Sequence, residues 1–263
     1  GVGRGTIFNE YEFVGYGLRS ADSRERMNEG LEILRQAFSG KPVDFKGEHF
    51  EVSFPELRPR PVQQPHPPIW QSAVAPASFE ACGRNGFPLM TVRLAIPQLV
   101  ERLALYEKGL AQSGLSEARQ AELRDSAAVW RHVYLADSDA QAEDELSAAL
   151  VEGRHHMNHA RETFNPSDFR VDEALLNPWA NTKVPDAEAL SFLLKNGVLY
   201  GTRDRVRGQI EELRDAGCNH VLCQMSFGYM PHAKIKKSMT DFADVMKGFR
   251  LTGEQPVLAS AAH

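Results

Sequence analysis

The sequence has few cysteines, no long apolar run and no excess of basic residues. Its three cysteines, Cys82, Cys218 and Cys223, lack C-x-x-C spacing, which argues against a disulfide framework and against a zinc site. No stretch approaches the ~18 apolar residues that a membrane span needs. The 30 Lys and Arg against 35 Asp and Glu leave a net charge of -5. This balance argues against nucleic acid or an anionic membrane as the main partner. The few cysteines, with no disulfide framework, favour a reducing cytoplasm.

The chain does contain an alternation of buried strands and amphipathic helices. A first helix is predicted over residues 23–38 and a hairpin over residues 43–54, and strand–helix units then follow to the end. Such an order is typical of an α/β protein with a parallel sheet. The predicted strands are 68–74, 89–92, 128–135 and 220–225. The predicted helices after the hairpin are 76–86, 97–110, one beginning after Ser138, 202–217 and 235–246.

One region interrupts this alternation. Residues 164–196 show no clean period, and Pro166, Pro178 and Pro185 indicate irregular structure. A long excursion of this kind in a compact domain is often a lid over an active site. The rest of the chain shows no composition break, so we expect residues 1–250 to belong to one domain and residues 251–263 to form a flexible tail.

Two places where strands end and helices begin favour an anion, because ligands of parallel α/β proteins gather there. Arg4 lies in a Gly-Arg-Gly turn, and Arg24 lies at a helix N-terminus, where a cation is unfavourable unless an anion neutralises it. The segment from Ala75 to Ser78 offers backbone N–H groups and a hydroxyl at a helix start. Each of these features has an ordinary alternative. The Gly-Arg-Gly segment is a simple turn, Arg24 is a solvated arginine, or Ser78 caps its helix or faces solvent.

Two other strand ends carry rings. Trp130 and His132 share one face of their predicted strand, where a histidine is either a site residue or a satisfied core residue. Residues 224–230 follow the last strand and either line an apolar mouth or pack in the core. His155 and His159 lie one helical turn apart without the acidic partner of H-E-x-x-H, so we interpret them as surface histidines and predict no metal.

Taken together, these residues resemble the luciferase-like family of flavin-dependent monooxygenases, which also contains deazaflavin-dependent oxidoreductases. The resemblance follows the order of the family's elements along nearly the whole chain. It implies a (β/α)8 TIM barrel, of which this chain would cover the end of strand 4 through helix 8. The segments that carry the resemblance are residues 1–5, 10–15, 23–24, 67–70, 76–80, 84–88, 201–204, 216–217 and 242–246.

The resemblance implies that reduced FMN binds at the C-terminal mouth of the barrel. Arg4, Arg24 and Ser78 would hold its phosphate, a role that suits guanidinium forks and helix-end amides. Ala75 stands where many relatives carry a phosphate-binding Ser, so that contact would fall to backbone amides. The residues that would pass beside the isoalloxazine ring are Ser72, Ala73 and Val74.

The same resemblance implies a substrate pocket and a candidate catalytic residue. His132 lies where some sulfonate-oxidising relatives place an active-site histidine, although Trp130 replaces the arginine that accompanies it there. The pocket would favour an apolar substrate. Its predicted lining residues are Trp130, Gln224, Phe227, Tyr229 and Met230.

The implied reaction uses reduced FMN from a separate NAD(P)H-dependent flavin reductase. Its reaction with O2 gives a C4a-peroxyflavin, which transfers one oxygen atom to a small organic substrate while the protein excludes water. Two rival functions stay open: deazaflavin (F420)-dependent hydride transfer on the same barrel, and a non-catalytic flavin-binding partner subunit.

The number of predicted strands bears on the length of the protein. Only four full strands follow Gly1, whereas a barrel of this type closes with eight. We therefore expect about 100 further residues before Gly1, at the usual barrel proportions. They would include the family's active-site histidine and the helices of a homodimer.

Overall fold

The computed structural model describes residues 1, 3, 8–171 and 176–249, which fall into two compact units. The larger unit contains Gly1 and the described residues of 70–163 and 170–250. The smaller unit contains the described residues of 2–69 and 164–169. Our expectation of one barrel domain over residues 1–250 stays a prediction.

The smaller unit is built on one helix and one hairpin. Helix α2 (Ser23–Phe38) and the antiparallel strands β1 (Val43–Lys46) and β2 (Glu51–Phe54) confirm the predicted elements. The Glu29 carboxylate of α2 accepts hydrogen bonds from the backbone N–H groups of Glu48 at 2.8 Å and Phe50 at 3.0 Å, which fixes the hairpin turn to the helix. Helix α1 (Glu10–Gly15) and a 3-10 turn, η1 (Ser20–Asp22), precede α2 and were not predicted.

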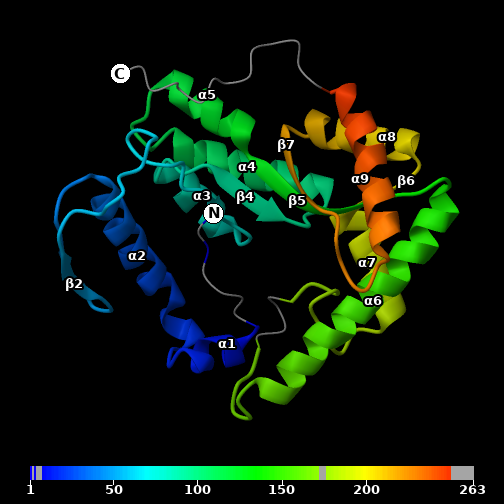
Figure 1. The fold of residues 1–263 in the computed structure, drawn as a ribbon, viewed down its shortest axis with the longest axis horizontal. Coiled ribbons are helices and arrows are strands. Elements are labelled where there is room, and N and C mark those ends of the chain that lie inside the picture. Colours follow the sequence, from blue (N-terminus) through cyan, green and yellow to red (C-terminus); the bar gives the residue numbers. More distant parts are fainter. Residues whose placement is uncertain (2, 4–7, 172–175, 250–263) are drawn as a thin grey trace. The chain divides into compact units, whose positions relative to one another are not determined.

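The larger unit contains a parallel sheet. Within the described residues, its order is β3-β4-β5-β6, and β7 also pairs with β5 (Figure 1). The strands are β3 (Gln71–Ser72), β4 (Leu89–Val92), β5 (Ala128–Leu135), β6 (Val198–Gly201) and β7 (His220–Gln224). The four predicted strands are therefore confirmed, although the first is only two residues long. The parallel α/β sheet is confirmed, and its closure into an eight-stranded barrel stays a prediction.

The helices of the larger unit follow the predicted order, with two additions. The predicted ones are α3 (Pro76–Arg84), α4 (Ile96–Leu110), α6 (Asp139–Phe164), α8 (Arg203–Asp215) and α9 (His232–Lys247). The additions are α5 (Glu117–Ser126) and α7 (Asp186–Gly197). Helix α7 corrects our expectation of an irregular segment over residues 164–196, because Ala189 and Leu193 bury one face of a short helix, and strand β6 after it was not predicted. None of the described helices is long and apolar enough to cross a membrane.

The two faces of the sheet differ in what covers them. Val129, Val133 and Leu135 of β5 are buried against apolar side chains of α4, α8 and α9. Because paired residues of parallel strands point to the same face, the opposite face is given by the strand register. We call it the Trp130 face, and it carries Ser72, Met90, Val92, Trp130, His132 and Gln224.

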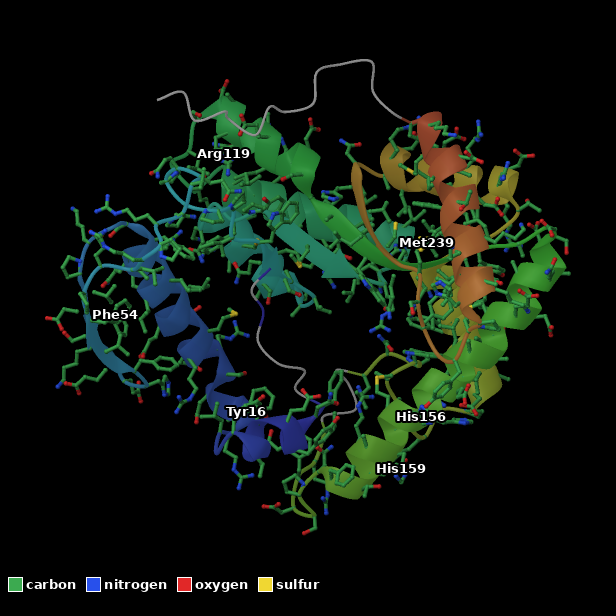
Figure 2. The ribbon with its side chains drawn as sticks, viewed as in Figure 1. Tyr16, Phe54, Arg119, His156, His159 and Met239 are labelled. Carbon is green, nitrogen blue, oxygen red and sulfur yellow. The ribbon has the colours of Figure 1, made fainter. Side chains whose placement is uncertain are left out.

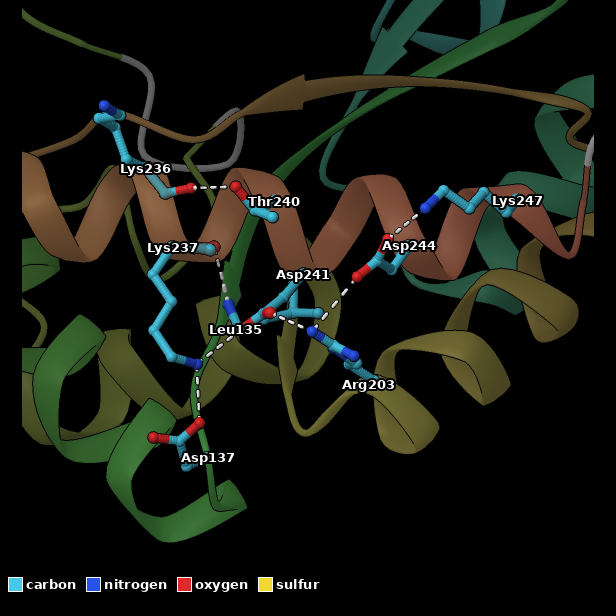
Figure 3. Close-up of polar contacts among 10 residues, drawn as sticks. Leu135, Asp137, Arg203, Lys236, Lys237, Thr240, Asp241, Asp244 and Lys247 are labelled. Carbon is cyan, nitrogen blue, oxygen red and sulfur yellow. Dashed lines mark hydrogen bonds and ion pairs between the residues drawn. The ribbon is translucent and has the colours of Figure 1, made fainter.

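A chain of ion pairs attaches α9 to the C-terminal end of β5 (Figure 3). Lys237 lies 2.7 Å from Asp137 and 2.8 Å from Asp241, while Arg203 lies 2.6 Å from Asp241. The buried Ser238 hydroxyl accepts a hydrogen bond of 2.9 Å from the N–H of Leu135. Helix α9 is therefore held at the strand end where the site begins.

Candidate active site

His132 lies in the middle of a ring cluster on the Trp130 face. Its imidazole meets Trp130 at a centroid distance of 4.6 Å and Phe227 at 4.9 Å, both edge to face. The side chain is 6% exposed, and its Nδ1 has no hydrogen-bond partner among the described residues. Burial, and then the positive charge of Arg93, lower the pKa of His132 to about 3. The imidazole is therefore neutral at physiological pH.

Arg93 follows the last residue of β4 and lies over the indole of Trp130, with its guanidinium carbon 5.0 Å from the ring centroid. Its backbone has a φ of 35°, a left-handed conformation that is unfavourable for a residue with a side chain. Alternation along β4 would send a side chain at this position to the face opposite Val92. With its left-handed backbone, Arg93 instead places its side chain on the Trp130 face, where the guanidinium lies over the indole. Our sequence reasoning missed Arg93, because an arginine directly after a strand is ordinarily a solvated side chain.

The segment after β7 closes one side of the ring cluster. Phe227 is buried in the core that Tyr134 forms with α6 and α7, and Met230 packs against that core. Gly228 has a φ of +56°, and a Cβ there would lie 2.5 Å from the carbonyl oxygen of Ala149. Only a glycine lets this segment approach α6 so closely.

The other two predicted pocket residues lie differently. Gln224 is paired in register with His132, and its amide donates to the carbonyl of Ser226 at 3.3 Å. Tyr229 is 72% exposed and meets His156 of α6, labelled in Figure 2, at a centroid distance of 5.5 Å. The structure thus brings Trp130, His132 and Phe227 together and leaves Tyr229 largely in solvent.

The predicted flavin residues of the larger unit lie along β3 and the start of α3. Ser72, Val74 and Ala75 are exposed, whereas Ala73 is buried. Helix α3 begins with Pro76, and no side chain caps its N-terminus. The half-buried Ser78 contributes a hydroxyl to the first turn. The uncapped helix end, with its positive dipole, is therefore accessible to an anion.

The predicted phosphate residues of the smaller unit lie at the start of α2. Arg24 is exposed and forms no ion pair among the described residues. The neighbouring Ser23 is 6% exposed, and its hydroxyl oxygen has no partner there. Ser23 is thus a buried polar group that sequence reasoning did not single out. Arg4 lies outside the described residues, and a shared phosphate site for Arg4, Arg24 and Ser78 stays a prediction.

The histidines of α6 belong to a different surface. His155 lies 2.6 Å from the carboxylate of Asp186, and His159, labelled in Figure 2, contacts Thr163. These histidines and the buried Arg154 border an open cavity of about 470 Å³. The described part of the chain contains no group of three His, Cys, Asp or Glu side chains that could hold a metal ion.

The sequence matches a family model and several curated proteins. The model described as luciferase-like monooxygenase matches residues 1–220. A Sinorhizobium fredii protein, y4wF, is 28% identical over 247 residues, which are 94% of this chain and 67% of the relative. The oxygenase component of flavin-dependent trigonelline monooxygenase from Acinetobacter baylyi is 29% identical over 185 residues, 70% of this chain and 48% of the relative. The chain thus spans about half to two thirds of the length of these relatives.

Solved structures share the fold at low sequence identity. Monooxygenase RslO1 from Streptomyces bottropensis has a TM-score of 0.71 at 22% identity, covering 95% of this chain and 68% of that one. The oxygenating constituent of 3,6-diketocamphane monooxygenase from Pseudomonas putida, in complex with FMN, has a TM-score of 0.64 at 16% identity, covering 97% and 72%. An F420-dependent secondary alcohol dehydrogenase has a TM-score of 0.58 at 21% identity, covering 84% and 62%.

Proposed function

Because the chain belongs to the luciferase-like monooxygenase family, we propose that it forms part of an enzyme that uses reduced FMN and O2 to oxygenate a small organic substrate. The observation that carries the proposal is the family match over residues 1–220, which includes every predicted flavin contact. When bound, reduced FMN supplies the reaction with O2 from which one oxygen atom passes to the substrate.

The described residues fit the phosphate end of a flavin in two places. The N-terminus of α3 has no side-chain cap and carries the Ser78 hydroxyl, and such a helix end suits a phosphate. At the start of α2, the Ser23 hydroxyl has no hydrogen-bond partner and Arg24 no ion pair among the described residues, so the two offer a second donor set. In our proposal, Arg4, Arg24 and Ser78 remain the contacts to the phosphate. Ser72 and Val74, both exposed, lie beside the flavin ring.

The ring cluster on the Trp130 face supports an apolar substrate site. Trp130 and Phe227 form its walls, and the neutral His132 adds one polar atom without adding a charge. In our proposal, these side chains exclude water from the reacting centre, which protects the oxygen transfer from unproductive loss. His132 positions the substrate or moves a proton at its unpartnered Nδ1.

The name of one curated relative supports a second protein in the reaction. That relative is the oxygenase component of its monooxygenase. We therefore propose that a separate NAD(P)H-dependent reductase supplies reduced flavin to this enzyme. That the enzyme works as a homodimer in the cytoplasm is a separate proposal, which rests on the family resemblance and on the few cysteines.

A second candidate is hydride transfer with F420 on the same fold. It is favoured by the likeness to F420-dependent enzymes, including the alcohol dehydrogenase above. The two cofactors differ in their reaction with O2, so reconstitution of the full-length protein with each one separates the candidates. We expect tight binding of FMN and O2 consumption with the reduced form. Tight F420 binding with no O2 uptake in the presence of reduced FMN would replace the first proposal with the second.

A variant of Arg4 tests the flavin site itself. Arg4→Ala removes a predicted guanidinium contact to the phosphate and is expected to weaken FMN binding by at least about tenfold. Unchanged affinity in a flavin titration would show that the phosphate assignment is wrong. Normal turnover by the purified single chain excludes the role of a non-catalytic partner subunit.

A further inference from the structure

Arg93 is a partly buried cation that lacks an acidic partner among the described residues. The interactions that surround its guanidinium are the face of Trp130 and the positive charge of Arg161. The Arg93 nitrogens are not among the buried side-chain atoms that lack a hydrogen-bond partner, so they are accessible, and the guanidinium has given up part of its hydration without gaining a carboxylate in return. Burial, together with Arg161, lowers the pKa of Arg93 to about 10, so the guanidinium is still charged at neutral pH.

The side chain is held in this place by its own backbone and by a glycine. A left-handed φ at a residue other than glycine, such as the 35° of Arg93, is unfavourable and persists only where the surrounding structure enforces it. Gly197, the last residue of α7, makes room for the arginine stem. A Cβ on Gly197 would lie 2.8 Å from Cγ of Arg93 and 3.1 Å from its Cδ. The position of the Arg93 side chain therefore depends on the left-handed backbone of Arg93 and on its close contact with Gly197.

Arg131 provides a contrast on the other face of the sheet. It is 3% exposed, and its guanidinium donates to the carbonyl oxygens of Trp130 at 3.1 Å and Leu94 at 2.8 Å. Arg131 thus satisfies its donors by fastening the segment that follows β4. Arg93 begins that same segment, yet its guanidinium forms no hydrogen bond to the described residues. A structural role accounts for Arg131, whereas the donors of Arg93 are bonded to none of the described residues and stay accessible to a ligand.

A second unpartnered group lies beside the first. The Nδ1 atom of His132 is buried without a hydrogen-bond partner in the described part of the chain, and Arg93 acts on His132 electrostatically. A planar carboxylate suits this pair of groups. It accepts two parallel hydrogen bonds from a guanidinium fork, and it lowers the cost of the buried positive charge.

We propose that Arg93 is a specificity-determining residue that binds the carboxylate of the substrate, while the apolar part of the substrate packs against Trp130 and Phe227. That the bound carboxylate is a substrate rests on the proposed function. The binding of a carboxylate by Arg93 needs no flavin and can be measured separately. It narrows the substrate class to organic carboxylates with an apolar body.

The test compares carboxylates with their neutral amides. Benzoate and benzamide form one matched pair, and hexanoate and hexanamide form another. Dissociation constants for the flavin-free, full-length protein are measured by ligand-observed NMR titration. We expect the wild-type protein to prefer the carboxylate in at least one pair by about tenfold or more, and Arg93→Gln to abolish the preference by weakening the carboxylate alone. Arg93→Lys keeps the charge without the fork and is expected to retain part of the preference.

Arg119→Gln is the matched control. Arg119, labelled in Figure 2, is exposed on α5 and pairs there with Glu122. The substitution should leave every dissociation constant unchanged. Equal binding of carboxylate and amide by the wild-type protein in both pairs, or an unchanged preference in Arg93→Gln with a native circular dichroism spectrum, overturns the inference. Oxygenation assays are run separately, so a protein that binds carboxylates but consumes no O2 refutes the proposed function and not the role of Arg93.

Discussion

Gly83 of α3 and Gly109 of α4 meet where the two helices cross, and a Cβ on Gly83 would lie 3.0 Å from the carbonyl carbon of Gly109. The missing Cβ atoms would also collide with the carbonyl oxygens of Tyr106 and Glu80, respectively. The two backbones therefore pack directly against each other. Because α3 carries Ser78 at its N-terminus, this crossing sets the place of the proposed phosphate contact.

A methyl group at the crossing should destabilise the protein. Gly83→Ala is expected to lower the free energy of unfolding by about 1–3 kcal/mol, because the added Cβ meets backbone atoms that cannot move aside. Gly153→Ala in α6 is the control, since a Cβ there meets nothing within 4 Å. It should raise stability by up to about 1 kcal/mol through helix propensity. Urea denaturation measures both, and equal effects of the two substitutions would contradict the close crossing.

The second prediction concerns the segment between α6 and α7. The buried Arg154 side chain donates to the carbonyl oxygens of Trp179 at 3.2 Å, Asn181 at 2.7 Å and Val184 at 2.8 Å. Arg154→Ala leaves these acceptors unpaired and should destabilise the protein by about 3 kcal/mol or more.

The control for Arg154 is a neighbour with a single exposed contact. His155→Ala removes one of the two partners of Asp186, the other being Arg154, and should cost less than about 1 kcal/mol. Protection of residues 177–185 from amide exchange should fall in Arg154→Ala and not in His155→Ala. Retained protection in the arginine variant would show that other contacts hold the segment.

The third prediction is a pH dependence from His132. Its pKa is lowered to about 3 in the folded protein, mainly by burial, from an ordinary value of 6.5. Between these values the unfolded chain binds a proton that the folded protein does not, so stability falls as the pH drops from about 6.5 toward 3. The slope has an upper limit of about 1.4 kcal/mol per pH unit.

A phenylalanine tests the origin of that slope. His132→Phe fills the space between Trp130 and Phe227 without a titrating group, so its stability between pH 6.5 and 5 should fall less steeply than that of the wild type. Denaturation at several pH values gives both slopes. Parallel slopes would mean that His132 is not responsible.

The fourth prediction separates the phosphate from the flavin ring. Ser78→Ala removes one hydroxyl from the first turn of α3 and should weaken FMN binding about tenfold, the usual effect of losing a hydrogen bond to a charged group. Riboflavin, which lacks the phosphate, should bind the variant and the wild-type protein alike. Equal weakening for both ligands would place Ser78 near the ring instead.

Much of the fold could be predicted from local pattern. Helix α2, strand β4 and strand β5 begin and end where the apolar spacing predicted, because each buries one face or one continuous run of apolar residues. Helix α7 and strand β6 could not be predicted in this way. They are short and follow one another without a turn, so their apolar residues merge into a segment with no readable period.

The candidate site also contains residues that the sequence predicted and one residue, Arg93, that it did not. Alternation along β5 places Trp130 and His132 on one face, Phe227 follows β7, and Ser78 lies in the first turn of α3, and the order of residues alone determines each of these places. The position of Arg93 over Trp130 does not follow from the sequence, because an arginine after a strand is ordinarily a solvated side chain. Only the tertiary structure turns it back over Trp130, against Gly197 and away from any carboxylate of the described residues. The physical reason is that sequence pattern reports which residues lose contact with water, whereas the neighbours that satisfy or fail to satisfy a buried charge are brought from distant parts of the chain.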